Sequence, residues 1–344
     1  MNKLYSRLAL KVTVFFSLIA LVSCTPLEKA EQELPNEKGQ DLASYGQMCA
    51  EAIRELPVFS CQTGALIPIT INGGQTPESY VPNMDCDRPS LLPLGEDSDG
   101  QCIPYSRVLD LSDGDAQVAA LCRQKKIRTA SDARIYYDEI DIVAHSAKDG
   151  STCWFQAKGK NSAPLNGTLV PSPMKSKPAI DYAAADVFWE SPIDVAKDDC
   201  GSCHDNDPFM YSPFIGQIWE KVPTDPFGWY KHLGKDFEDW KPVSLSTRNN
   251  PCVGCHRLGV QFTSGQGTEE ASGQADIPNA DSWAKSYPAS HFMPVGNFHS
   301  EAQWNVIYAQ SVQDILDCHN AYEVQDTKQL GILGCLTEPI TGKP

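Results

Sequence analysis

The chain has 344 residues, of which 41% are hydrophobic and 21% charged, so it can form one or two folded domains and is neither a disordered tail nor a disulfide miniprotein. Its 28 Lys and Arg face 44 Asp and Glu, and the formal charge of -16 excludes a protein that binds the phosphate backbone of a nucleic acid. Thirteen cysteines are too many for a chain kept in a reducing cytosol, and they predict disulfide, metal or cofactor chemistry.

The N-terminal segment has the form of a secretion signal. Basic residues precede an uncharged apolar stretch, Val12 to Val22, which is too short for a permanent membrane span. The stretch ends in Leu21-Val22-Ser23-Cys24, which resembles the lipobox of bacterial lipoproteins. The resemblance implies cleavage before Cys24, lipidation of that residue and a tether to the lipid bilayer, and Thr25 favours the outer membrane, on its periplasmic face or at the cell surface. An ordinary cleaved signal peptide is the alternative.

The next part of the mature chain predicts β structure with short helices. Two β-rich runs, residues 134–145 and 151–157, are joined by a turn that contains Asp149-Gly150, which is the best hairpin signal in the chain. Residues 158–180 are rich in Gly, Pro, Asn and Ser and predict a loop. The remaining expected elements are a helix near 48–56, a strand near 65–71 and a helix near 115–125.

Beyond Cys200 the sequence becomes aromatic-rich and predicts mainly helix. The clearest helix runs from Ser300 to Cys318, because Ser300 and Gln303 form a capping-box pattern and apolar residues recur on one face. Those apolar residues are Trp304, Ile307, Tyr308, Val312, Ile315 and Leu316.

Two pentapeptides carry the chemistry. Cys200-Gly201-Ser202-Cys203-His204 and Cys252-Val253-Gly254-Cys255-His256 both match CxxCH. In this motif two thiols on one helical turn reach the two vinyl groups of a haem, and the histidine that follows lies beneath the iron as its proximal ligand. Zinc sites do not need a histidine after each CxxC pair, and a thioredoxin-like pair occurs once, after a strand of an α/β pattern. The motifs therefore predict two covalently bound c-type haems.

The other cysteines support this interpretation. Without Cys24 and the four pentapeptide cysteines, eight remain, which is an even number. We expect Cys318 to pair with Cys335, and the six earlier cysteines to pair among themselves in one of fifteen possible ways. These six are Cys49, Cys61, Cys86, Cys102, Cys122 and Cys153.

The second pentapeptide has a wider family resemblance. A Met293-Pro294 loop and the amphipathic helix follow it, so that residues 248–318 resemble a class I cytochrome c. The resemblance implies that His256 is the proximal ligand and Met293 the distal ligand of the second haem. His291 is the rival distal ligand, and packing of Met293 in the core is the remaining alternative.

The distal ligand of the first haem is less defined. His232 is the first choice, because Met210 follows His204 too closely for the chain to turn around the porphyrin edge. The alternatives are an open site or one of His145, Met174, His291, His299 and His319. Acidic residues around His204 and Arg257 beside His256 lead to the hypothesis that electrons flow from the first haem to the second.

The fold class that follows is α+β. Residues 1–23 form the signal peptide, 24–44 a lipidated flexible tether, 45–190 a β-containing, disulfide-stapled domain and 191–344 a mainly α-helical haem domain. The chain as a whole resembles a dihaem c-type cytochrome lipoprotein, which implies single-electron transfer with redox partners that carry basic docking surfaces. One alternative is a dihaem peroxidase-like enzyme with one open haem. The other is a lipoprotein that binds a partner or ligand and carries a redox module.

Overall fold

The structure is a computed structural model. It describes residues 39–82, 84–88, 99–160, 163–175, 180–210, 213–216, 218–219, 222–223, 225–271 and 301–344. The lipidation candidate Cys24 and the ligand candidates His291, Met293 and His299 lie outside the described residues, as do Ser300, the signal peptide and most of the expected tether. The described residues form a mixed α and β fold.

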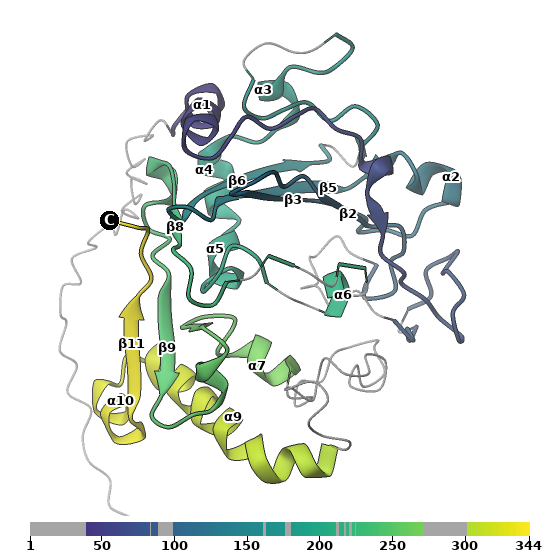
Figure 1. Ribbon diagram of the computed structural model, residues 1–344. Helices are drawn as coiled ribbons and strands as arrows, with labels where there is room; N and C mark the ends of the chain where they lie inside the picture. Colours follow the sequence, from purple (N-terminus) through teal and green to yellow (C-terminus); the bar gives the residue numbers. More distant parts are fainter. Residues whose placement is uncertain are drawn as a thin grey trace, which may run out of the picture. The chain divides into compact units, whose positions relative to one another are not determined.

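A six-stranded sheet organises the first half of this fold (Figure 1). Neighbouring strands are antiparallel, except that the short last strand runs parallel to the strand beside it. That last strand comes from the region after the first pentapeptide and so joins the two halves of the chain. The spatial order is β1 (Ala65–Leu66), β2 (Arg107–Asp110), β3 (Ala116–Arg123), β5 (Glu139–Ser146), β6 (Ser151–Lys158) and β8 (Lys231–His232).

The helix expected over residues 115–125 is wrong, because this segment is strand β3. Its burial alternates strictly, with Ala116, Val118, Ala120 and Cys122 buried and the residues between them half-buried. The alanines favour helix, but β5 pairs with one edge of the segment along its whole length and β2 pairs with residues 119–122 on the other edge. Tertiary pairing therefore overrides the local helix propensity.

The predicted hairpin is confirmed. Strands β5 and β6 pair from Glu139–Lys158 to His145–Thr152, and the connecting turn ends at Gly150. Gly150 has φ +83°, and an added Cβ would lie 2.5 Å from the backbone carbonyl carbon of Trp229. Glycine is therefore required here both for the left-handed conformation and for the close approach of the chain that leads into β8.

The first helix lies earlier in the chain than expected. Helix α1 spans Leu42–Ala52, because Asp41 is its N-cap and accepts a hydrogen bond from the backbone N–H of Ser44 at 2.9 Å. The strand expected over 65–71 is shorter, and only β1 forms. The other elements before Cys200 are η1 (Cys61–Thr63), α2 (Ala130–Ala133), β4 (Tyr136–Tyr137), β7 (Leu165–Asn166), α3 (Ala185–Phe188) and α4 (Pro192–Lys197).

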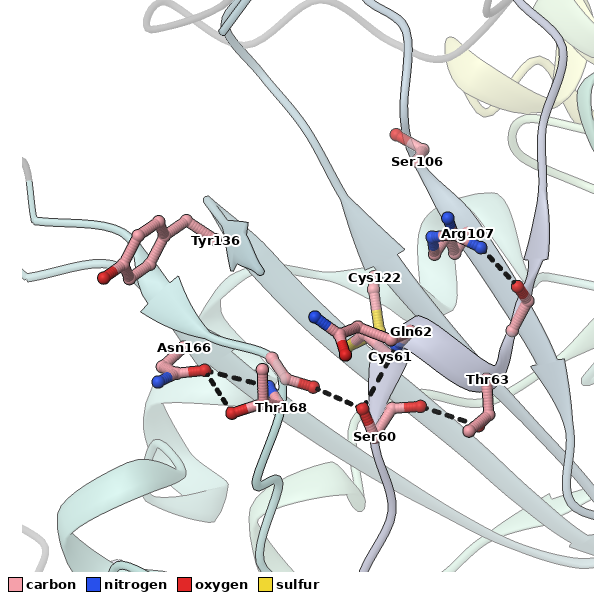
Figure 2. Close-up of a disulfide and its surroundings, with 12 residues drawn as sticks. Ser60, Cys61, Gln62, Thr63, Ser106, Arg107, Cys122, Tyr136, Asn166 and Thr168 are labelled. Carbon is pink, nitrogen blue, oxygen red and sulfur yellow. Dashed lines mark hydrogen bonds between the residues drawn. A yellow bond between two sulfur atoms is a disulfide. The ribbon is translucent and has the colours of Figure 1, made fainter. Parts of the chain in front are cut away.

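Disulfides fasten this half of the fold. The expected pairing of the six earlier cysteines among themselves is confirmed as Cys49–Cys153, Cys61–Cys122 and Cys86–Cys102. Figure 2 shows Cys61, in η1, bonded to Cys122 of β3, beside Arg107, whose Nη1 donates to the carbonyl of Gly64 at 2.7 Å. The first two disulfides lie within the main apolar core, so covalent and hydrophobic stabilisation act on the same elements.

The region after Cys200 is less helical than expected. It contains a three-stranded antiparallel sheet in the order β10 (Leu258–Gly259), β9 (Val243–Thr247) and β11 (Cys335–Pro339). Helix α9 (Glu301–Glu323) packs against β9, which confirms the long C-terminal helix (Figure 1). The other elements are α5 (Cys200–Cys203), α6 (Pro213–Gly216), η2 (Lys235–Phe237), η3 (Cys252–Gly254), α7 (Gln266–Ala271) and α10 (Thr327–Leu333).

A fourth disulfide holds the second sheet to its helix. Cys318 of α9 pairs with Cys335 at the start of β11, as the sequence predicts. Leu245 and Val260 pack with Cys318 in a small buried cluster around this bond. Among the described residues, no helix is both long and apolar enough to cross a membrane.

Candidate functional site

Each pentapeptide folds as a single helical turn, α-helical in the first (α5) and 3-10 in the second (η3). In the first, α5 ends with the backbone N–H of His204 donating to the carbonyl of Cys200 at 2.9 Å. In the second, the N–H of His256 donates to the carbonyl of Cys252 at 2.8 Å. A turn of this kind places the two cysteines and the histidine on one face, because positions i, i+3 and i+4 lie together.

The pentapeptide cysteines are distinguished by their bonding. Eight of the twelve cysteines that the structure describes form the four disulfides, and the remaining four are Cys200, Cys203, Cys252 and Cys255. Burial raises the pKa of the Cys200 thiol to about 12 and raises that of Cys252 as well. At neutral pH both are therefore thiols rather than thiolates, which disfavours a nucleophilic role for these two residues.

His204 faces an aromatic cluster. Its ring lies 4.8 Å from that of Trp154 on β6, and Trp240 packs against Gly201 within the same pentapeptide. Nδ1 of His204 is buried and makes no hydrogen bond within the described part of the chain. Burial lowers the pKa of His204 to about 4, although the backbone carbonyls of Pro208 and Asp207 act in the opposite direction and favour the protonated ring. The neutral ring in an apolar pocket fits an iron ligand, whose chemistry needs an unprotonated nitrogen.

His232 lies in the same cluster. It is on β8, and its Nδ1 accepts a hydrogen bond of 2.9 Å from the indole Nε1–H of Trp154. Its ring also contacts Tyr230 and Trp240, at 4.8 and 5.3 Å. Burial, and secondarily the charge of His204, lower the pKa of His232 to about 3. The structure thus brings His232 and His204 to one side chain, Trp154.

Three other residues considered as distal ligands make protein contacts instead. His145 is buried on β5, and its Nδ1 lies 2.8 Å from the hydroxyl of Thr152. The sulfur of Met174 accepts a hydrogen bond from the backbone N–H of Leu56. His319, on α9, lies with its Nδ1 3.1 Å from the hydroxyl of Ser264.

Sequence reasoning missed Trp154 and its role in this cluster. Strand periodicity alone predicts that Trp154 and Thr152, which are two residues apart, share one face of the sheet. The pairing of β6 with β8, which brings His232 to that face, joins residues distant in sequence and could not be predicted from local patterns.

Asp205 ties the first pentapeptide to the segment after the second. It follows His204 directly, and its carboxylate accepts hydrogen bonds from the backbone N–H of Gln261 and the hydroxyl of Thr263, both at 2.7 Å. The carbonyl of Ser202, inside the pentapeptide, also accepts from the N–H of Phe262. Burial outweighs these hydrogen bonds and raises the pKa of Asp205 to about 6.

Arg257 makes the reciprocal tie. It follows His256 directly, and its guanidinium donates to the carbonyls of Asn206 and Gly228, each at 2.7 Å. Asn206 returns a side-chain hydrogen bond to the carbonyl of Arg257. Arg257 also lies 3.9 Å from the carboxylate of Asp207, whose pKa burial raises to about 7. We call Asp205, Asn206, Asp207 and Arg257 the reciprocal clasp, which holds the two pentapeptides in one local unit.

Comparison with known proteins finds no matching family, no matching curated protein and no matching solved structure.

The resemblance to dihaem c-type cytochrome lipoproteins, and to a class I cytochrome c over residues 248–318, is corrected by these findings. No family matches, and the described residues contain no group of three or more His, Cys, Asp and Glu side chains arranged to hold a metal ion. The expected helical haem domain is not seen, because strand β10 follows the second pentapeptide and pairs with β9. Membership in a known cytochrome family therefore gives no support to the function.

Proposed function

We propose that this protein transfers single electrons through two haems bound covalently at its two pentapeptides. Cys200 and Cys203 would form thioether bonds to the first haem, and Cys252 and Cys255 to the second. His204 and His256 would be the proximal ligands, and Met293 the distal ligand of the second haem. When bound, the haem supplies an iron that changes its charge by one electron. The porphyrin provides four of the six iron ligands, so each site needs no more than two protein ligands.

One observation carries the proposal. In a chain with four disulfides, the four described cysteines outside them are those of the two CxxCH turns. An oxidising environment that forms the other disulfides would also oxidise unprotected thiols two residues apart, unless a cofactor occupies them. The proposal therefore accounts for all twelve cysteines that the structure describes.

The chain's own residues would set the properties of the two sites. The reciprocal clasp fixes the pentapeptides to each other, which keeps any distance between the two irons constant. Trp154, Tyr230 and Trp240 exclude water around His204, and the phenol of Tyr230 donates to the carbonyl of His204 at 2.8 Å. Electron transfer is fast when the surroundings of the iron move little as its charge changes, and a packed site around His204 would meet this condition.

Mass spectrometry tests this proposal. The mature protein, made in a host with working haem attachment, is expected to carry two added haem masses. C200S/C203S and C252S/C255S should each lose one haem, whereas the control C86S/C102S, which removes a disulfide, should keep both. A wild-type protein without added haem, made in a host that loads a reference CxxCH protein, would end the proposal.

We also propose that the mature chain is a lipoprotein tethered through Cys24 to the bacterial outer membrane, facing the periplasm or the cell surface. The lipobox-like sequence that ends at Cys24 supports this anchor. The formal charge of -16 favours redox partners with basic surfaces. Fractionation of cells that express C24A should move the protein from the membrane fraction to the soluble fraction. An unchanged membrane fraction in C24A would contradict this anchor.

A further inference from the structure

We propose that His232 does not ligate the iron at the first pentapeptide but presents its Nε2–H as a hydrogen-bond donor to a small ligand of that iron that carries an acceptor atom, such as cyanide or hydrogen peroxide. The inference rests on the proposed function, because it concerns a haem held by Cys200, Cys203 and His204. It replaces the expectation from sequence that His232 is the sixth ligand.

The hydrogen bond from Trp154 carries the inference. An indole Nε1–H can only donate, so Nδ1 of His232, 2.9 Å away, must accept with its lone pair. A neutral imidazole carries one proton, which then resides on Nε2. The outward nitrogen of His232 is therefore an N–H donor and has no lone pair for a metal.

Ligation by His232 through Nε2 would require the opposite tautomer. Its proton would move to Nδ1, where it would face the indole N–H of Trp154, donor against donor. Histidines that bind a metal normally donate their second nitrogen to a carbonyl, a carboxylate or water. His232 lacks this arrangement, whereas the buried Nδ1 of His204 has no competing donor among the described residues.

The rings around His232 hold this orientation. Tyr230 and Trp240 contact its ring edge-on, and Trp154, which is 3% exposed, cannot rotate away without opening the core. Strand β8 fixes the backbone, since the N–H of Leu233 donates to the carbonyl of Thr152 at 2.9 Å. A donor held in this way beside an iron stabilises a bound ligand that carries an acceptor atom.

Optical spectra and cyanide titration of the oxidised protein test the inference. We expect one of the two haems to be high-spin and to bind cyanide. This signal should remain in C252S/C255S and disappear in C200S/C203S. H232L should stay high-spin but bind cyanide about tenfold more weakly, which is the effect of one lost hydrogen bond. H232Q, which can accept from Trp154 and still donate an N–H, should bind nearly as tightly as the wild type.

The outcomes separate the inference from the proposed function. A protein without haem ends both. A protein with two low-spin haems, one of which becomes high-spin in H232L, retains the proposed function and overturns the inference, because His232 would then be a ligand. H145F, which alters another buried histidine in contact with Tyr230, serves as the control and should leave the spin state unchanged.

Trp154 provides a second, independent variant. W154F removes the indole donor, which frees His232 to place its proton on Nδ1 and to bind iron through Nε2. We expect W154F to shift the first haem toward low spin, and W154F/H232L to restore high spin. If W154F leaves both the spin state and the cyanide affinity unchanged, Trp154 does not set the tautomer and the inference fails.

Discussion

At the scale of single residues, the positions directly after the two histidines matter as much as the pentapeptides themselves. Asp205 and Arg257 each bond to the segment that follows the other motif. In the sequence, the charges of these residues lead only to the hypothesis that electrons flow from the first haem to the second. The structure instead places the guanidinium of Arg257 3.9 Å from the carboxyl of Asp207, whose pKa burial raises to about 7, so the charge of this pair depends on pH.

Replacing Arg257 with Lys should destabilise the protein. A lysine has one ammonium group and cannot reach the carbonyls of Asn206 and Gly228 together, so a half-buried acceptor loses its donor. We expect the free energy of unfolding to fall by about 2 kcal/mol, measured by denaturant titration. R248K is the matched control, because Arg248 is exposed, and it should change stability by less than about 0.5 kcal/mol. Equal effects of both variants would show that the reciprocal clasp contributes nothing.

His145 should make stability depend on pH on the acid side. Burial lowers its pKa from 6.5 to about 4, so between these values the unfolded chain binds a proton that the folded chain does not. The free energy of unfolding should therefore fall as the pH drops from 6.5 to 4, by up to roughly 3 kcal/mol from this residue. In H145Q this part of the loss should disappear. Unfolding curves of wild type and H145Q that stay parallel from pH 7 to 4 would contradict the assignment.

At the scale of elements, local patterns identified the hairpin and the long helix but not the partners of each strand. The β5–β6 hairpin and α9 depend on periodicity and turn residues, which are local. Strand β3 was mistaken for a helix because its alternation is carried partly by alanines, which favour helix when no strand pairs with them. The parallel pairing of β6 with β8 brings His232 to Trp154 and depends on contacts between distant segments, which no local pattern reports.

The disulfides should contribute unequally to stability. Cys49–Cys153 links α1 to β6 across 104 residues, whereas Cys318–Cys335 spans 17. In the chain-entropy account, the longer loop restricts the unfolded state more, by about 4.7 against about 3 kcal/mol. We expect C49A/C153A to lower the denaturant midpoint more than C318A/C335A, with the protein kept oxidised. The reverse order would show that local packing, rather than loop length, decides their contribution.

At the scale of the whole molecule, charge is the property that sequence predicts most directly. The formal charge of -16 does not depend on the fold, and it favours encounters with basic surfaces. The pairing of Cys318 with Cys335 and the separation of the pentapeptide cysteines from the disulfides were also predictable by counting. The specific pairing of the six earlier cysteines was not, because it depends on how the sheet is assembled.

Salt should slow electron exchange with basic partners. Raising the ionic strength from about 0.01 M to about 0.1 M shortens the screening length from roughly 30 Å to roughly 10 Å. We expect the bimolecular rate with a small basic redox protein to fall over this range, and the rate with an acidic redox protein to rise. Stopped-flow absorbance would measure both. Rates that change in the same direction for the two partners would rule out steering by the overall charge.

The segment from Cys335 to Lys343 has a consequence for how the protein is assembled. It supplies strand β11 to the sheet beside the second pentapeptide, and beyond this strand Thr341 accepts a hydrogen bond from Tyr230, while Lys343 donates to Asp149 at the hairpin turn. These residues are synthesised after both CxxCH motifs. While the chain is still emerging, strand β9, Tyr230 and the hairpin turn therefore lack these partners, and both sheets become complete only when the last residues of the chain arrive.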